Sequence, residues 1–559
     1  MIFSRLPIEL HLMIIGYLGP IDIFHVQLTC TALNGLIEDS SEHIWRHCLR
    51  MHIIHNDLFA PSYAHLTTAA ELRHAATAPL RFASAYREAV TSNSPISKTT
   101  KMLNFPVNDA KDTEEDLMEM YLIPGGRFLL TFKQNSVSLW DIRSAPNVEL
   151  SVSTEIGDYN SMLYLDAVSD NTIRVIYLVD GPDANQKVVS HYRFLELRWT
   201  AEHTFTVHHL GALALVHNSE ISMQSLSITE SRIIILLGDT TVVWDYQNNS
   251  CTGWRLMGVS IPSELFSNDR YVLYLTNEGI HGVSFFDFNP VTGGYVKMDA
   301  LSAHPVSPAF SVYFKEGPYD LIGNILLPNK VWVSDSDIPI DGETDLNIYI
   351  RESSFTLKVD RESEALPLQL CPDGRWEQEL PMGYDIGHFG DDELYGTLQV
   401  HRYTFNYCPS TPATSSLTRV STTKHTIPPM RNSRYSAECY PARYFSAPFY
   451  QKCDGPETAV TLWSDGGDEA DFFGEGAKPV FFSFVDDRME GSNKQVTMVP
   501  FINPRQFTTQ AWVLESEVCP ASAKGVVMWG DDGDDPHDIP AQDGVLGKWV
   551  ELYEIGRIA

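Results

Sequence analysis

The first 55 residues place apolar side chains at the spacing of short helices. Residues 7–18 open with Pro7, which suits the first turn of a helix, and they are apolar around most of the circumference, with only Glu9 and His11 strongly polar. Residues 21–28 repeat this pattern. Two further stretches carry apolar side chains on one face: Leu33, Leu36 and Ile37 after Thr31, and Trp45, Cys48, Leu49 and Ile53 after Ser41. We therefore predict four short helices in residues 1–55.

These four helices display more apolar surface than their own small core could cover. A module of about 50 residues buries little surface by itself. One explanation is that the helices pack onto the rest of the chain. The other is that they form half of an interface with a separate protein, since obligate interfaces have apolar cores. The periodicity alone leaves both explanations open.

Residues 56–104 have the pattern of a helical linker. The stretches 67–76 and 80–90 are rich in Ala, and Phe82, Tyr86 and Ala89 fall at helical spacing in the second of them. Residues 91–100 (TSNSPISKTT) are polar with one Pro, which is typical of a connecting segment.

From about residue 105 the pattern changes to pairs of apolar strands joined by short turns. Residues 127–132 with 136–142, 232–237 with 240–246, and 270–275 with 282–288 each read as a hairpin ending in an aromatic residue and Asp. Residues 172–179 and 188–199 give a degenerate copy. Further strands are expected at 320–327, 330–333, 394–405, 458–485 and 524–553.

The recurrence of such units at intervals of about 40–60 residues is typical of a β-propeller or a similar radial array. Because one small sheet cannot cover both of its faces, neighbouring sheets must stack. In such units Trp140, Trp244 and Phe286 are expected to pack, and Asp141, Asp245 and Asp287 to hydrogen-bond turns. We assign none of them a functional role.

The composition narrows the class of protein. The chain has 559 residues, 43% hydrophobic residues and a formal net charge of −32. An acidic surface of this size repels phosphate backbones and anionic membranes, so neither nucleic acid nor membrane is an expected partner. Eight cysteines without a Cys-x-x-Cys pair are typical of buried thiols in a reducing compartment. We expect a cytoplasmic or nuclear protein.

Catalytic and metal-binding patterns are missing from the sequence. There is no Gly-x-Ser-x-Gly elbow, phosphate-binding Gly-rich loop or His-Glu-x-x-His motif. The acidic runs 465–471 and 531–535 lack the spacing of a helical calcium loop and are interpreted as solvated loops. We expect no enzymatic activity, no metal and no cofactor.

The N-terminal helices resemble the F-box motif. The resemblance is carried by Leu6-Pro7-Ile8-Glu9, Tyr17-Leu18-Gly19-Pro20-Ile21-Asp22-Ile23, Cys30 at a helix start, and Trp45. It implies docking on the Skp-type adaptor of a cullin–RING ubiquitin ligase. The implied docking residues are Leu6, Pro7, Leu10, Ile14, Leu18, Ile23, Val26, Cys30 and Leu33, with Trp45 bracing the last helix. Met13 and Leu33 depart from the family's usual acidic and aromatic residues, and both remain compatible with packing.

The aromatic-Asp endings are similar to those of WD-type repeats, although the usual Gly-His opening is missing. The expected fold class is therefore multidomain α+β: an all-α F-box module at 1–55, a helical linker at 56–104 and an all-β, WD-repeat-like propeller at 105–559. The expected function is the substrate-recognition subunit of an SCF-type ubiquitin ligase, with an unknown protein substrate on the propeller. The alternatives are an interaction scaffold outside ubiquitin transfer and a propeller enzyme acting through channel carboxylates.

Overall fold

A computed structural model describes most of the first 314 residues and separated strands beyond them. Described are residues 6–55, 58–92, 96, 98–105, 117–157, 161–168, 171–182, 188–217, 223–229, 231–259, 262, 264–267, 271–276, 278–284, 291–292, 295–302 and 305–314. Beyond residue 314 the description covers the strands given below together with residues 411, 414, 415, 522, 523 and 556.

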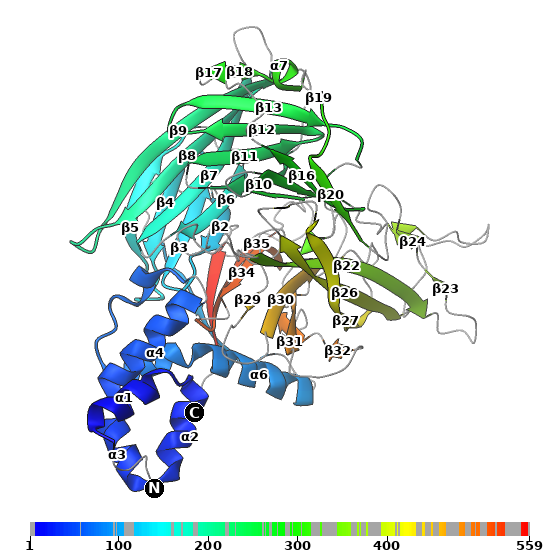
Figure 1. The fold of residues 1–559 in the computed structure, drawn as a ribbon. Helices are drawn as coiled ribbons and strands as arrows, with labels where there is room; N and C mark the ends of the chain where they lie inside the picture. Colours follow the sequence, from blue (N-terminus) through cyan, green and yellow to red (C-terminus); the bar gives the residue numbers. More distant parts are fainter. Residues whose placement is uncertain are drawn as a thin grey trace, which may run out of the picture.

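The described N-terminal part is helical, as the sequence predicts. It contains α1 (Ile8–Gly16), α2 (Pro20–Thr29), α3 (Thr31–Asp39), α4 (Ser41–His55), the 3₁₀ turn η2 (Ala60–Tyr63), α5 (Ala69–Ala76) and α6 (Ala78–Ser92). Pro20 occupies the first turn of α2, and Thr68 and Glu71 form a capping box at the start of α5. The helices lie below the sheets, and α6 runs along their underside (Figure 1).

Four sheets follow in chain order, each built mainly from antiparallel neighbours in sequence. The first holds β2 (Leu117–Leu122), β3 (Phe128–Lys133), β4 (Ser136–Asp141) and β5 (Glu149–Glu155). The second holds β6 (Ser161–Val168), β7 (Thr172–Pro182), β8 (Val188–Trp199), β9 (Phe205–His217) and β18 (Tyr295–Lys297). The third holds β10 (Met223–Ile228), β11 (Arg232–Leu237), β12 (Thr240–Asp245), β13 (Ser250–Leu256), β17 (Val291–Thr292) and β19 (Pro305–Val306). The fourth holds β14 (Glu264–Ser267), β15 (Tyr271–Leu275), β16 (Gly279–Ser284) and β20 (Phe310–Tyr313), and the short helix α7 (Met298–Ser302) precedes β19.

The remaining strands form further sheets. One contains β21 (Ile325–Leu326), β22 (Thr344–Lys358), β23 (Leu366–Pro367), β26 (Glu393–Tyr407), β27 (Ser416–Arg431) and β32 (Lys494–Thr497), and β24 (Gln369–Leu370) pairs with β25 (Trp376–Glu377). Another contains β28 (Cys439–Pro441), β29 (Phe449–Tyr450), β30 (Thr458–Asp465), β31 (Val480–Asp486) and β33 (Val499–Ile502). The last contains β34 (Ala511–Cys519), β35 (Lys524–Asp531), β36 (Trp549–Ile555) and β1 (Lys98–Met102).

The last sheet pairs the first described strand with the last one and corrects the linker prediction. Lys98 to Met102 pair antiparallel with Ile555 to Glu551, although residues 91–100 read as a polar linker. The sequence pattern missed this strand because one short edge strand, half exposed along its length, carries no apolar alternation. Residues 56–104 are therefore not a simple connector, since they supply one strand of the β-rich region.

The predicted hairpins are present where the structure describes them. β3–β4 and β11–β12 form from the predicted residues, β7–β8 confirm the degenerate copy, and β15 pairs with β16, which overlaps the predicted second strand at residues 282–284. The apolar runs are continuous because both faces of β3 and β11 are covered. Phe286, Asp287, residues 327–343 and residues 466–479 and 532–548, which hold most of both acidic runs, lie outside the described residues.

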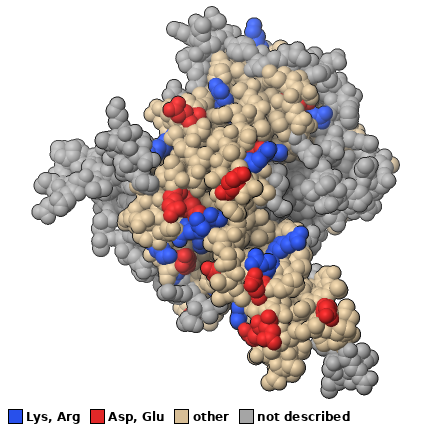
Figure 2. Space-filling view, turned by 90° about the vertical axis from the view of Figure 1, so that its left-hand side faces the viewer, with Lys and Arg blue, Asp and Glu red and all other residues tan. Residues whose placement is uncertain are grey.

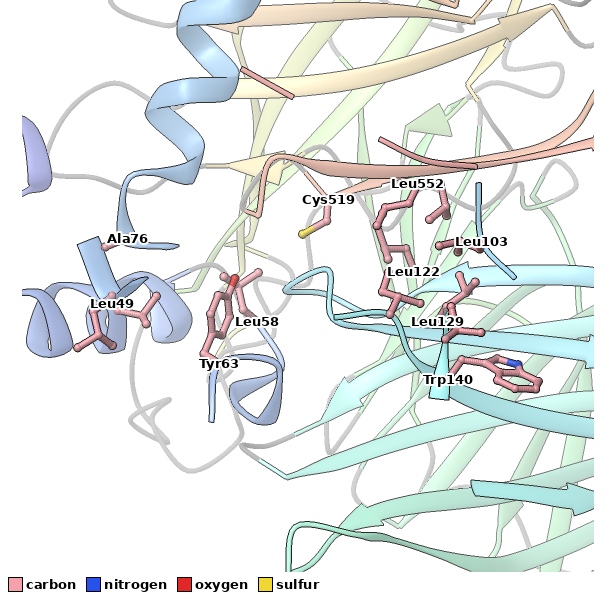
Figure 3. Close-up of a cluster of buried hydrophobic side chains, with 14 of the residues drawn as sticks. Leu49, Leu58, Tyr63, Ala76, Leu103, Leu122, Leu129, Trp140, Cys519 and Leu552 are labelled. Atoms are coloured by element: carbon pink, nitrogen blue, oxygen red, sulfur yellow. The ribbon is translucent and has the colours of Figure 1, made fainter. Parts of the chain in front are cut away.

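Clusters of buried hydrophobic side chains lie between successive sheets, and one further cluster connects the sheets to the helices. One cluster fills the space between the first and second sheets and another lies between the second and third. A third cluster runs from the helices to the first and last sheets through Leu49, Leu58, Tyr63, Cys519, Leu129 and Leu552 (Figure 3). The first of the two explanations for the apolar helices, packing onto the rest of the chain, therefore holds for one side of the module. It is α4 and the segment after it that make this contact.

Candidate functional site: an apolar face on the N-terminal helices

The first helix divides its apolar side chains between core and solvent. Ile15 points inward with 1% of its surface exposed. Leu10, Met13, Ile14 and Tyr17, spaced i, i+3, i+4 and i+7, lie on the opposite side of α1 and are 40, 59, 41 and 80% exposed. A helix that is apolar all round therefore covers a core on one side and presents an apolar stripe on the other.

The second helix also carries exposed apolar side chains. Ile21 and Leu28 stand seven residues apart, two helical turns, and are 43 and 83% exposed. With Ile8 at the start of α1, seven of the thirteen exposed large hydrophobic side chains in the described residues fall within residues 8–28. Such a concentration marks an interaction surface, whereas single exposed hydrophobics do not. We name these seven residues the apolar face: Ile8, Leu10, Met13, Ile14, Tyr17, Ile21 and Leu28.

A tight core holds the apolar face in place from behind. Ile23, Ile37, Ile44 and Trp45 are each at most 1% exposed. The rings of Phe24 and Trp45 lie 5.4 Å apart, which is a favourable aromatic separation. The core fixes the orientation of α1 and α2, so the apolar face is presented on a rigid scaffold.

The structure distributes the predicted docking residues over three environments. Pro7, Leu10, Ile14 and Cys30 are exposed, and Leu6, Leu18, Val26 and Leu33 are half-buried. Trp45, on the last of the four helices, is buried with 1% of its surface exposed. Ile23 is also buried, at 1% exposure, so its side chain belongs to the core behind the apolar face.

Five residues of the apolar face were not among the docking residues carried over from the family motif: Ile8, Met13, Tyr17, Ile21 and Leu28. The signal for them was in the sequence, because residues 7–18 and 21–28 are apolar around most of the helix circumference and a small core can cover only one side. Which side faces inward depended on the position of Ile15 against α4, and this could not be read from α1 alone.

The charged groups described at this site form surface ion pairs and no catalytic or metal-binding cluster. Arg46 and Glu42 form an exposed i, i+4 pair at 2.9 Å, which adds little stability. Among the described residues, no three His, Cys, Asp or Glu side chains are grouped to hold a metal ion. In the same part of the chain, none of the helices combines the length and apolar character that a membrane crossing requires.

The described surface seen in Figure 2 carries both signs of charge. Lys and Arg side chains alternate with Asp and Glu side chains there, and the described residues of this face form no large patch of one sign. The described residues of that face therefore form no basic patch of the kind that binds phosphorylated motifs.

Comparison with known protein families identifies the helical module. The family model of F-box-like domains matches residues 3–51. The N-terminal module is therefore an F-box-like domain, followed by a sheet-rich region. A search of curated proteins found no match to the sequence.

Solved structures similar to the chain include propeller-type proteins. The WD40 domain of SCAP from fission yeast covers 79% of this chain and 82% of its own, with 8% identity and a TM-score of 0.26. Hsv2p from Kluyveromyces lactis covers 55% and 98%, with 10% identity and a TM-score of 0.20. The Nup170 N-terminal domain from Chaetomium thermophilum, in its complex with Nup53, covers 87% and 68%, with 10% identity and a TM-score of 0.28. TM-scores this low do not define a shared fold, so the closed propeller stays a prediction.

Proposed function

We propose that this chain is the substrate-recognition subunit of a cullin–RING ubiquitin ligase. The apolar face binds a Skp-type adaptor, and the sheet-rich region binds a target protein. The observation that carries the proposal is the gathering of seven exposed apolar side chains on an F-box-like domain. Exposure of these apolar side chains to water is unfavourable, and binding in an apolar groove of a partner removes them from solvent.

The sheet-rich region is proposed to close into a WD-repeat-like propeller. Its support is the run of four consecutive antiparallel sheets that share buried clusters, and the last sheet, which pairs the first described strand with the last. Loops from several sheets would then present a composite binding surface.

On this proposal the chain catalyses no reaction and works in the cytoplasm or nucleus. It raises the effective concentration of a target beside a ubiquitin-charged enzyme. No nucleic acid, membrane, metal or cofactor takes part. A cullin is reached only through the adaptor.

The test uses the full-length chain, because Ile15, Trp45 and Leu49 belong to the same core cluster as Leu129 and Leu552. Deleting residues 1–55 would uncover that core and confuse loss of binding with loss of folding. Full-length protein with Leu10→Asp or Ile14→Asp is instead titrated with purified Skp-type adaptor by interferometry. Both residues are 40–41% exposed, so folding is expected to survive.

We expect each substitution to weaken adaptor binding at least 100-fold, since a carboxylate would be buried without a partner. Met257→Asp is the matched control, because Met257 is 45% exposed outside the helical module and should bind the adaptor normally. Unchanged binding by Leu10→Asp and Ile14→Asp would contradict the proposal. Adaptor binding without recruitment of a cullin would favour the alternative, an interaction scaffold outside ubiquitin transfer.

A further inference from the structure

The segment that leaves the F-box-like domain is bound closely to the turn between β2 and β3. The backbone N–H of Phe59 donates to the carbonyl of Pro124 at 3.2 Å, and the hydroxyl of Ser62 donates to the same carbonyl at 3.2 Å. Gly125 lets the two backbones approach, since a Cβ at that position would stand 2.6 Å from the Cβ of Ser62. We name residues 59–63 and 124–127 the joint.

Phe59 inserts into the sheet-rich region. It is fully buried, and its ring lies 6.0 Å from that of Phe128 and 6.1 Å from that of Phe205. These partners belong to β3 and β9, in the first and second sheets. An aromatic ring held between two sheets resists bending of the segment that carries it.

Arg127 connects the two sides of the joint by hydrogen bonds. Its Nε and Nη2 donate to the carboxylate of Asp141 at 3.0 and 2.8 Å, and its Nη1 donates to the carbonyl of Pro61 at 2.7 Å. The guanidinium also lies over the rings of Phe128 and Trp199, at 4.5 and 5.4 Å from their centroids. Arg127 is 6% exposed, so these contacts are made away from solvent, where charge-assisted hydrogen bonds are strong.

A second attachment lies at the last sheet. The carbonyl of Arg81 on α6 stands so close to Gly556, just after β36, that a Cβ there would be 2.5 Å from the carbonyl oxygen. The backbone N–H of Gly125 also donates to Sγ of Cys519, at the end of β34. Helix α6 therefore also approaches the last sheet, and Cys519 of that sheet lies against the turn that carries Gly125.

We infer that Arg127 is a positioning residue that fixes the F-box-like domain relative to the sheet-rich region, and so sets where a bound target stands in front of the ubiquitin-charged enzyme. This inference rests on the proposed function. Its physical basis is that transfer between two tethered groups depends on how often they meet in a productive geometry. A rigid joint limits the number of acceptor lysines that the ubiquitin-charged enzyme can reach. A loosened joint brings more lysines within reach, but ubiquitin is transferred to each of them more slowly.

The first experiment measures the joint without reference to ubiquitin. Ketone-bearing noncanonical residues at Asp39 on α3 and Glu155 on β5, both exposed, carry spin labels and leave the native cysteines untouched. Double electron–electron resonance then gives the distance distribution between them in the full chain. We expect one narrow distribution for the native residue and a distribution at least twice as wide for Arg127→Met.

The matched control is Arg174→Met. Arg174 pairs with the buried Glu196 at 3.3 Å, and its removal leaves Glu196 with Arg198 at 2.6 Å. In the same way Arg127→Met leaves Asp141 with Arg143 at 2.8 Å. The control therefore removes an equivalent ion pair within the second sheet, and the distance distribution should keep its native width.

Arg127→Lys separates charge from geometry. Lysine restores the charge beside Asp141, but a single ammonium group cannot also take over the bond to the Pro61 carbonyl across the joint. We expect a folded protein with a widened distribution, and this variant carries the test if Arg127→Met does not fold. A native distribution in Arg127→Lys, or in a folded Arg127→Met, would overturn the inference.

The second experiment reads out ubiquitin transfer in a reconstituted complex of full chain, Skp-type adaptor, cullin–RING and conjugating enzyme, with the chain's own lysines as acceptors. Peptide mapping should find ubiquitin on few lysines in the native chain and on additional lysines in Arg127→Lys, at a total rate at least threefold lower, while the adaptor affinity stays within twofold. An unchanged lysine pattern with a widened distance distribution would overturn the link to transfer. Absence of adaptor binding by the native chain would instead count against the proposed function, and the resonance result would still decide whether Arg127 sets the joint.

Discussion

Phe24 on α2 and Trp45 on α4 pack ring against ring at 5.4 Å, and the guanidinium of Arg73 on α5 lies over both rings at 4.7 and 5.6 Å. The F-box-like match ends at residue 51, yet a residue 22 positions further on covers this aromatic pair. The helices of the F-box-like domain and the helices that follow them therefore form one packed body.

Removing the indole ring of Trp45 should strongly destabilise this packed group of helices. For Trp45→Ala we expect a loss of about 3–5 kcal/mol in the free energy of unfolding, because a fully buried aromatic leaves a cavity. Arg73→Ala should cost only about 0.5–1 kcal/mol, the usual size of an exposed cation–π contact. Urea unfolding followed by tryptophan fluorescence measures the Arg73 variant, and circular dichroism measures both. Equal losses for the two variants would argue against this packing.

Truncating residues of the apolar face that the family motif did not supply should also weaken binding to the adaptor. Tyr17→Ala and Leu28→Ala remove the two most exposed large hydrophobic side chains, at 80 and 83%. We expect each to weaken adaptor binding about tenfold, as for anchor residues of an interface. Tyr313→Ala, which truncates a side chain 59% exposed on β20, should leave the affinity unchanged. Native affinity in both helical variants would restrict the interface to the residues of the motif.

Gly125 and Gly157 allow backbone strain to be separated from crowding. Both have positive φ, 103° and 80°, but a Cβ at Gly157 would meet nothing within 4 Å. Gly157→Ala should cost about 1–2 kcal/mol from the left-handed backbone alone. Gly125→Ala adds the clash with Ser62, for which we expect about 1–3 kcal/mol more. Chemical denaturation of the two variants gives the difference, and equal costs would mean that the joint adapts freely.

His281 should make stability fall as the solution becomes mildly acidic. The residue is fully buried, with Nδ1 2.8 Å from the hydroxyl of Ser311 and Nε2 3.0 Å from the hydroxyl of Thr276. Burial lowers the pKa of His281, and the nearby Glu278 opposes this only in part. With the folded pKa below the unfolded value of about 6.5, the unfolded chain takes up the proton first. The contribution of this group to stability is therefore present above that pH and is lost as the pH falls from there towards the folded pKa.

The measurement is the free energy of unfolding at pH 7.5 and pH 5.5, with and without His281→Gln. Glutamine keeps a hydrogen-bonding side chain and does not titrate in this range. The native chain should lose more stability between the two pH values than the variant does. An identical loss in both would show that other groups carry the pH dependence.

The local sequence pattern was sufficient to predict an element where its hydrogen-bonding and packing partners lie nearby in the chain. The first four helices form where the apolar spacing predicted them, and β3–β4 and β11–β12 form because an apolar run, a tight turn and a second apolar run are adjacent in the chain. β1 was missed because its partner β36 lies more than 400 residues away. The expected turn bonding of Asp245 is present, through the backbone N–H of Asn248 at 2.9 Å. Asp141, which was given the same role and no other, also anchors the joint through Arg127.

The sequence by itself determined the helical F-box-like module, the excess of apolar surface on it and the strand hairpins that follow, because each depends on residue spacing within one element. Only the tertiary structure decided which side of α1 is exposed, how the segment after the module enters the core, and that Arg127 bonds to both Asp141 and Pro61. These outcomes depend on contacts between residues far apart in the chain, and periodicity along one element carries no information about what packs against it.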